Sequence, residues 1–241
     1  METINSLQNG RIKKWTLLHT KKGRDEQHRF LVEGEHLLEE ALKAGTVEYI
    51  VTDEDRPETD VPVIRVTEGI MKKLSENVSA VHVIGVCRMQ EMSVLKEERL
   101  LLLDGVQDPG NAGTLIRTAV SFGFDAVYMS KDSCDLYNEK TIRSTQGAFF
   151  HIPVIRTDLK DLIRQLQKSG VTVIATALDA SENMENIPPS EKIAFVLGNE
   201  GQGVSKMIQE ASDLRLRIEM NGFESLNVAV AGGIVMYRYR K

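Results

Sequence analysis

Two regions of the chain differ in their pattern of apolar and polar residues. In residues 1–92, short apolar runs predict strands at 30–32, 49–51 and 81–87. The apolar residues of 35–43 repeat at the spacing of one helical face, which predicts a helix. That face consists of Leu37, Leu38, Ala41 and Leu42. Three strands with two or three helices predict a small α/β domain of ordinary size.

After a polar linker at 93–99, strands alternate with helices. Apolar runs predict strands at 100–103, 126–129, 171–175, 193–197 and 214–218, and helical patterns cover 114–122, 159–168 and 204–211. Unbroken apolar strands that alternate with helices are typical of a mostly parallel sheet covered on both faces. We therefore expect residues 100–241 to form one α/β domain. Such sheets bind ligands in the loops that follow their strands.

The first of these loops begins at Asp104 and leads into a helix that Asp108 or Asn111 could cap. One stripe of the helix combines small residues with a single cation: Gly110, Gly113, Thr114, Arg117 and Ser121. Such a stripe permits the close approach of another backbone or of a ligand, and Arg117 is the charge that reaches out from it. A surface arginine on an ordinary amphipathic helix explains the same pattern.

The second loop, Leu197-Gly-Asn-Glu-Gly-Gln-Gly203, joins a strand to a helix through three glycines. Glycines permit a positive φ and let backbone N–H groups meet a ligand. The loop has neither the lysine of a Walker loop nor the spacing of the dinucleotide fingerprint, and Glu200 would repel a phosphate. A neutral or zwitterionic ligand, a structural role for Glu200, and a plain tight turn are the open interpretations.

The third loop runs from Ile218 into an apolar helix. Ser225 is a natural N-cap for a helix that begins at about Leu226 and is small and apolar on nearly all sides. A helix of this kind is expected to be buried, within the fold or across a subunit boundary. Asn227 would then be a buried amide that needs partners. An ordinary core helix explains the apolarity but not the loop before it.

Together the three loops resemble the motifs of the SpoU/TrmH branch of the SPOUT RNA methyltransferases. The motifs are Asn111-x-Gly113-x-x-x-Arg117, Leu197-Gly-Asn-Glu-Gly201 with Gly203, and Ile218-x-Met220 followed by Ser225-Leu-Asn-Val-Ala229. Arg143 and residues 146–153 also resemble the family. Glu219 departs from the family pattern, which usually has proline there.

The resemblance implies a deep trefoil knot and a homodimer whose active site is completed across the interface. Periodicity alone would not propose a knot, because knots are rare. It also implies methyl transfer from S-adenosylmethionine to a ribose 2′-hydroxyl of RNA. The cofactor-binding residues are expected to be Thr176, Ala177, Leu197, Gly198, Ile218, Met220 and Leu226.

The catalytic group that the resemblance implies comprises Arg117, Asn111, Glu200, Asn227 and Ser225. Arg117 would lie near the hydroxyl, as a base or as an orienting cation. Because the free pKa of arginine is roughly 12.5 or higher, orientation and charge stabilisation are the easier roles. Asn227 and Glu200 would hold the geometry of the site, and Ser225 would contact RNA or cap its helix.

The charge distribution points to the RNA contacts. The net charge of −5 argues against nucleic acid, but residues 1–30 carry seven Lys and Arg against three Asp and Glu. Local cation density can supply phosphate contacts, although a solvated helix face explains it equally well. Residues 12–14 and 30–34 resemble a ribosomal-protein-like RNA-binding domain, so ribosomal RNA is slightly preferred over transfer RNA. The expected RNA contacts are Arg11, Lys13, Lys14, Lys21, Lys22, Arg24 and Arg143.

The cysteines and the apolar stretches of the chain indicate its cellular compartment. Cys87 and Cys134 lie far apart in no Cys/His cluster, so neither a disulfide framework nor a metal site is expected. Free thiols, a polar N-terminus and the lack of an apolar stretch of ~20 residues predict a cytoplasmic protein without a membrane span. Two rival functions are a non-catalytic RNA-binding module that kept the fold, and a nucleotide-dependent enzyme that uses the glycine turn for phosphate.

Overall fold

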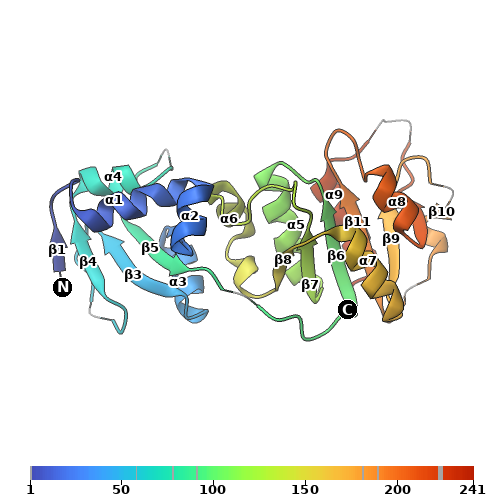
Figure 1. Cartoon of the computed structure of the whole chain (residues 1–241), viewed down its shortest axis with the longest axis horizontal. Coiled ribbons are helices and arrows are strands. Elements are labelled where there is room, and N and C mark those ends of the chain that lie inside the picture. Colours follow the sequence, from blue (N-terminus) through green and yellow to red (C-terminus); the bar gives the residue numbers. More distant parts are fainter. Residues whose placement is uncertain are drawn as a thin grey trace. The chain divides into compact units, whose positions relative to one another are not determined.

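The structure, a computed structural model, describes residues 2–57, 59–77, 79–90, 92–180, 182–188, 190–221 and 225–241 (Figure 1). The chain divides into two compact units. The first unit comprises Met1–Glu91 and Tyr137–Phe150, and the second comprises Met92–Leu136 and His151–Lys241. The sequence-based boundaries of 1–92 and 100–241 differ from this division, because they keep residues 137–150 in the second domain.

The described residues of the first unit form a five-stranded sheet in the order β1-β4-β3-β5-β2. Its strands are β1 (Glu2–Ile4), β2 (Arg29–Glu33), β3 (Val47–Thr52), β4 (Val63–Val66) and β5 (Val83–Arg88). Its helices are α1 (Gly10–Thr16), η1 (Leu17–His19), α2 (Lys21–Gln27), α3 (Glu35–Lys43), α4 (Glu68–Leu74), α6 (Glu139–Thr145) and η2 (Ala148–Phe150). The β1, β4 and β3 strands are parallel, and β5 is antiparallel to β3 and β2. The sequence predicted β2, β3 and β5 but not the short strands β1 and β4.

Helices cover both faces of this sheet. Residues of α1 and α4 pack on the face that holds Val51 and Ile84, and α3 packs on the face that holds Ile50 and Val83. Neighbouring residues of a strand point to opposite faces, so these are two separate apolar layers. On the predicted apolar face of α3, Leu37, Leu38 and Ala41 are buried, while Leu42 is exposed to solvent.

Residues 137–150 complete the core of the first unit. The Phe30 ring of β2 lies 4.8 Å from the Tyr137 ring and 5.8 Å from the Phe149 ring, between centroids, and Phe150 lies nearby. Phe30 is fully buried as a result. Residues 137–150 therefore supply apolar surface that residues 1–92 do not contain.

The described residues of the second unit form a seven-stranded sheet in the order β10-β12-β9-β11-β6-β7-β8, and every neighbouring pair is parallel. Its strands are β6 (Arg99–Asp104), β7 (Ala126–Met129), β8 (Val154–Arg156), β9 (Thr172–Thr176), β10 (Glu182–Asn183), β11 (Ile193–Gly198) and β12 (Leu214–Arg217). Its helices are α5 (Pro109–Ser121), α7 (Leu159–Lys168), η3 (Met184–Asn186), α8 (Lys206–Ala211) and α9 (Val228–Arg238). The predicted parallel sheet is confirmed, while β8 and β10 were missed.

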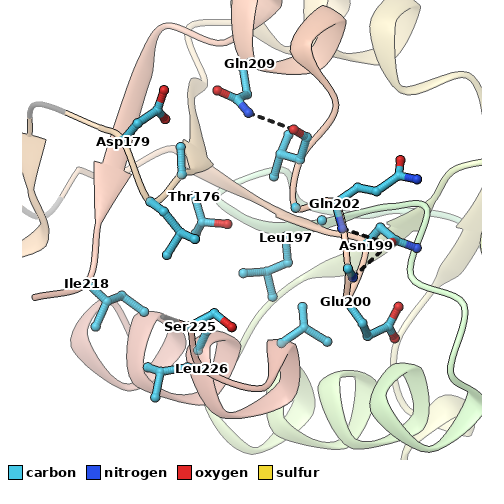
Figure 2. Close-up of a pocket in the computed structure, with 18 of the residues that line it drawn as sticks. Thr176, Asp179, Leu197, Asn199, Glu200, Gln202, Gln209, Ile218, Ser225 and Leu226 are labelled. Carbon is cyan, nitrogen blue, oxygen red and sulfur yellow. Dashed lines mark hydrogen bonds between the residues drawn. The ribbon is translucent and has the colours of Figure 1, made fainter. Parts of the chain in front are cut away.

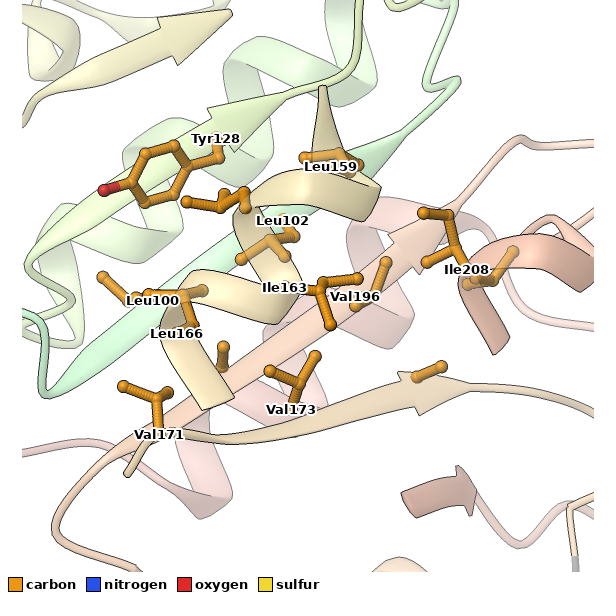
Figure 3. Packing of buried hydrophobic residues seen from close by; sticks show 14 of the residues in the cluster. Leu100, Leu102, Tyr128, Leu159, Ile163, Leu166, Val171, Val173, Val196 and Ile208 are labelled. Carbon is orange, nitrogen blue, oxygen red and sulfur yellow. The ribbon is translucent and has the colours of Figure 1, made fainter. Parts of the chain in front are cut away.

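Helices also cover both faces of the second sheet. Leu100, Leu102 and Val196 form an apolar cluster with residues of α7 and α8 (Figure 3). On the other face α5 packs against α9, and the contact is close. A Cβ atom on Gly232 of α9 would lie 2.7 Å from the Leu197 side chain of β11. The helices thus enclose the central strands, which is why those strands are apolar on both faces.

Two helices begin at other residues than predicted. The α5 helix begins at Pro109, ahead of the helical pattern at 114–122. Its N-cap is Asp108, whose side chain accepts a hydrogen bond from the Asn111 N–H, so Asp108 is confirmed as one of the two predicted caps. The α9 helix begins at Val228. Its N-cap is Asn227, so the assignment of that role to Ser225 is wrong.

The sequence left burial of α9 within the fold or across a subunit boundary open, and within the single chain its burial is incomplete. Gly232, Val235 and Met236 are buried, but Val230 is 52% and Tyr237 57% exposed. An all-round apolar helix therefore keeps one apolar face open to solvent. Among the residues that the structure describes, no helix combines the length and apolarity that crossing a bilayer requires.

Candidate functional site

A cavity of about 460 Å³ lies where β9, β11 and β12 end, next to the start of α9 (Figure 2). Gly198 at the end of β11 is in register with Asp104 at the end of β6, so the loops after these strands leave the same edge of the sheet. The cavity is lined by Thr176, Ala177, Leu178, Asp179, Leu197, Gly198, Asn199, Glu200, Gly201, Gln202, Gly203, Val204, Gln209, Leu216, Ile218, Met220, Ser225, Leu226, Val228 and Ala231.

The glycine turn after β11 forms one wall of the cavity. Asn199 and Gly203 exchange two backbone hydrogen bonds of 3.0 and 2.8 Å, and the Asn199 side chain accepts from the N–H groups of Gly201 and Gln202. A Cβ atom on Gly198 would lie 2.0 Å from the backbone of Gly203. No side chain fits at Gly198, so the turn requires glycine there.

All seven residues predicted to bind the cofactor line this one cavity. They come from the ends of β9 and β11 and from the segments after β9 and β12, and Figure 2 shows Thr176, Leu197 and Leu226 around the same space. The structure brings them together, and their role in cofactor binding stays a prediction. Sequence reasoning missed Asp179 and Gln209. Asp179 lies in the loop after β9, next to the predicted Thr176 and Ala177. Gln209 lies on α8, whose sequence has no pattern that marks a binding residue.

Three of the predicted catalytic side chains are joined by hydrogen bonds. The Glu200 carboxylate accepts from Asn111 Nδ2 at 3.0 Å. The Oδ1 atom of the same Asn111 accepts from Asn227 Nδ2, also at 3.0 Å. Asn227 Oδ1 in turn accepts from the first N–H groups of α9. One polar chain therefore connects all three loops. Asn227 lies at the surface, so the prediction that its amide is buried is wrong.

Glu200 is tied to the start of α5. Its carboxylate also accepts from the backbone N–H groups of Gln107 and Asp108, at 3.2 and 3.0 Å. Partial burial raises the pKa of Glu200, but the hydrogen bonds from Asn111, from its own backbone N–H and from those of Asp108 and Gln107 outweigh burial and lower it below the usual 4.5. An anion beside a helix N-terminus is favourable. Of the interpretations of Glu200 left open by the sequence, these contacts favour the structural role.

Arg117 and Ser225 lie apart from this polar chain. Ser225 lines the cavity. Arg117 is exposed on α5 and is not among the lining residues, and its guanidinium has no hydrogen bond or ion pair within the described part of the chain. Gly113, expected on the same open stripe, is buried instead. The structure thus leaves Arg117 free to contact a group from outside the chain.

The predicted RNA contacts fall into two groups. Lys13, Lys14, Lys21 and Lys22 are exposed on α1 and α2 of the first unit, as the prediction requires. Arg24 is 5% exposed and donates to the carbonyl groups of Leu18 and His19, which corrects its assignment to RNA. Arg11 is paired with Glu2, and Arg143 with Glu139 and Asn77.

A second hollow of about 480 Å³ lies on the exposed face of α9. It is lined by Met184, Val230, Gly233, Ile234, Tyr237, Arg238 and Arg240. Arg240 lies over the Tyr237 ring, 4.1 Å from its centroid. Apolar side chains exposed together in this way are typical of an interaction surface.

Comparison with known proteins gives two family matches. The SpoU rRNA Methylase family matches residues 98–237, and the MRM3-like substrate binding domain matches residues 9–85. The chain is 42% identical, over 247 residues and 100% of both chains, to the 23S rRNA (guanosine(2553)-2′-O)-methyltransferase RlmP of Bacillus subtilis (strain 168).

Solved structures are similar along nearly the whole chain. An AdoMet-bound rRNA methyltransferase from Sinorhizobium meliloti is 29% identical, with a TM-score of 0.87, and the match covers 98% of this chain and 96% of that one. The SpoU methyltransferase AviRb from Streptomyces viridochromogenes, in complex with AdoMet, is 23% identical, with a TM-score of 0.85. That match covers 95% of this chain and 96% of the other. The second likeness concerns the fold alone.

Proposed function

Because the chain belongs to the SpoU rRNA methylase family, we propose that it transfers the methyl group of S-adenosylmethionine to a ribose 2′-hydroxyl of ribosomal RNA. The observation that carries the proposal is the cavity after β9, β11 and β12, which the second and third motifs line, and to which Asn111 of the first motif is tied by hydrogen bonds to Glu200 and Asn227. Its size suits a small organic ligand. The relative in Bacillus subtilis acts on 23S rRNA by its name, and we extend that substrate class to this chain.

The residues around the cavity fit the donor. Leu197, Ile218 and Leu226 offer apolar walls for an adenine, and at Gly198 the backbone is free of any side chain. Directed hydrogen bonds would come mainly from backbone groups of these loops. S-adenosylmethionine supplies a methyl group that its sulfonium already activates, so the chain's task is to position the hydroxyl and assist loss of its proton.

Arg117 is the residue we assign to the ribose hydroxyl. Its charge suits orientation of the sugar and stabilisation of a developing alkoxide better than proton abstraction. The chain of Glu200, Asn111 and Asn227 holds α5, the glycine turn and α9 at fixed distances, so it positions the site. Ser225 on the cavity wall would contact RNA.

We further propose a homodimer through the exposed face of α9. Val230, Ile234 and Tyr237 form an apolar face that a second copy would cover. Arg117 lies outside the cavity of its own chain, which supports an active site completed by the partner. Ile234→Glu should yield monomers in sedimentation experiments and lose methylation. A variant that stays dimeric and active would contradict this assembly.

The proposal includes the deep trefoil knot of the family, in which the chain after Ile218 threads through a loop, and a cytoplasmic location where ribosomal RNA is modified. The first unit would hold the RNA, with Lys13, Lys14, Lys21 and Lys22 at the phosphates. Its match to a substrate binding domain supports that division of labour.

The test is to map ribose methylation of ribosomal RNA in cells with and without the gene, and to repeat the reaction with purified protein, RNA and S-adenosylmethionine. Loss of one methylated ribose in the deletion strain, restored by the wild-type gene, is expected. An unchanged map, together with no heat of binding for S-adenosylmethionine, would favour a non-catalytic RNA-binding module.

A further inference from the structure

We propose that Glu219 is a positioning residue for the methyl donor and acts through a hydrogen bond to Asn183. The inference rests on the proposed function, because it concerns the same cavity. Glu219 lies between Ile218 and Met220, which both line the cavity. Glu219 is not one of the lining residues. Its carboxylate instead accepts a hydrogen bond from Asn183 Nδ2 at 2.9 Å.

The Asn183 amide is held in one orientation by its own contacts. In β10, Asn183 is in register with Arg217 of β12, so its backbone follows the strand that leads to Ile218. Its Oδ1 atom accepts from the Glu185 N–H and caps η3. Because the oxygen is engaged in the cap, the amide nitrogen is the atom that faces Glu219.

Residues 182–187, the β10–η3 brace, are anchored to the core at their far end. The Tyr239 hydroxyl is within hydrogen-bond distance of the carbonyl oxygens of Met184 and Ile187, at 3.1 and 3.0 Å. Tyr239 is 2% exposed, and its ring lies 4.7 Å from the Phe195 ring, between centroids. Phe195 belongs to β11, the strand that ends in the glycine turn.

The brace therefore connects two walls of the cavity. One wall is the end of β11 at Leu197 and Gly198, and the other is the segment 218–220, which has no strand or helix structure of its own. The bond between Glu219 and Asn183 fixes the second wall to a brace that is rooted in the first. Loss of this bond should weaken donor binding and leave the transfer step unchanged once the donor is bound.

The experiment measures the dissociation constant of S-adenosylmethionine by calorimetry on the full chain, together with KM and kcat. Glu219→Ala should raise the dissociation constant about three- to tenfold, the range expected for one exposed hydrogen bond to a charged group. Asn183→Asp keeps the oxygen that caps η3 but opposes two carboxylates, so a similar loss is expected. Glu185→Ala removes a neighbouring exposed charge and is the matched control, with no effect expected.

Rescue separates positioning from a general loss of structure. Glu219→Gln keeps an acceptor and should bind the donor within about twofold of wild type. The pair Glu219→Gln with Asn183→Asp reverses donor and acceptor and should recover most of the affinity lost in Asn183→Asp. In the impaired variants KM for the donor should rise while kcat and KM for RNA stay unchanged.

Two failures can be told apart. Wild-type protein that does not bind S-adenosylmethionine would overturn the proposed function, and this inference with it. Wild-type protein that binds, alongside a Glu219→Ala variant of equal affinity, would overturn the inference alone. So would a reversed pair that binds no better than Asn183→Asp.

Discussion

The polar side chains near the cavity of the second unit bond to one another, whereas the lysine side chains on α1 of the first unit do not bond within the chain that the structure describes. In the second unit, Asn111 bonds to Glu200 and to Asn227, from which it is separated by 89 and 116 positions. In the first unit, Lys13 and Lys14 are exposed and have no ion pair within the described residues. Side chains that hydrogen-bond to one another hold their loops in place, whereas exposed lysines without such bonds are available to a binding partner. Substitutions of Asn111, Glu200 or Asn227 should therefore disturb the same geometry. Substitutions of Lys13 or Lys14 should have small and independent effects.

Arg117 combines features of both regions, and its substitution should have the largest effect. Its side chain is as free as those lysines, but it belongs to the unit with the cavity. Arg117→Ala should lower the methylation rate by about 10²- to 10³-fold, because a charge that stabilises the developing alkoxide is lost. The affinity for S-adenosylmethionine should stay near that of wild type. Single-turnover assays with saturating donor measure the rate, and retained turnover would remove Arg117 from the mechanism.

Gly198→Ala should have the next largest effect. The new Cβ atom would lie 2.0 Å from the Gly203 backbone, which cannot rotate away. The turn must shift, so donor affinity should fall by at least about tenfold and the protein should lose about 1–3 kcal/mol of stability. Gly201→Ala is the matched control, because its Cβ would meet one side-chain oxygen at an ordinary 3.6 Å. Calorimetry and thermal unfolding of both variants check this, and equal affinities would contradict the account of the turn.

The free lysines of the first unit should show a smaller effect. The double variant Lys13→Gln/Lys14→Gln should weaken RNA binding and reduce the slope of log K against log salt by about 0.7–0.9 for each phosphate that the protein no longer neutralises. Donor affinity should not change. Lys160→Gln/Lys168→Gln on α7 removes the same charge from the second unit. If this control weakens RNA binding as much, net charge rather than the α1 surface determines affinity.

Glu200→Gln should have the smallest effect, and that effect should depend on pH. At pH 7 the variant should unfold with about 1 kcal/mol less free energy, the low end for hydrogen bonds to a charged group that is partly exposed. The folded-state pKa of Glu200 lies below 4.5. The charge therefore stabilises the fold above pH 4.5, and its contribution is lost as the pH falls through the lowered value. Urea unfolding at neutral and acid pH should show the gap closing, and a gap independent of pH would argue against the charge.

In the second unit, the sequence predicted the central strands of the sheet better than its edge strands. The strands β6, β7 and β11 are apolar runs buried on both faces, so their pattern is unambiguous. The edge strand β10 consists of Glu182 and Asn183, and no apolar pattern marks such a pair. The sequence-based boundaries place residues 137–150 apart from the first unit, because the packing of their aromatic side chains on Phe30 joins segments far apart in the sequence.

The residues of the site could be predicted from the sequence, but the hydrogen bonds between them could not. The strand-end position drew attention to the loops, because parallel sheets bind ligands at that edge, and the resemblance to the SpoU/TrmH family implied Gly198 and Leu226 within them. The bonds from Glu200 to the start of α5, and from Glu219 to Asn183, depend on tertiary distances that no spacing reports. The sequence also left open whether α9 is buried within the chain or across a subunit boundary, since an apolar pattern does not tell one from the other.

The central claim is that the loops around Gly198 and Leu226, tied together through Asn111, enclose one pocket for a sulfonium methyl donor. A crystal structure of the chain with S-adenosylmethionine tests it most directly. The account predicts density for the donor in the cavity after β9, β11 and β12, in contact with Gly198, Ile218 and Leu226. Density for the donor at another place on the chain, with this cavity empty, would contradict it.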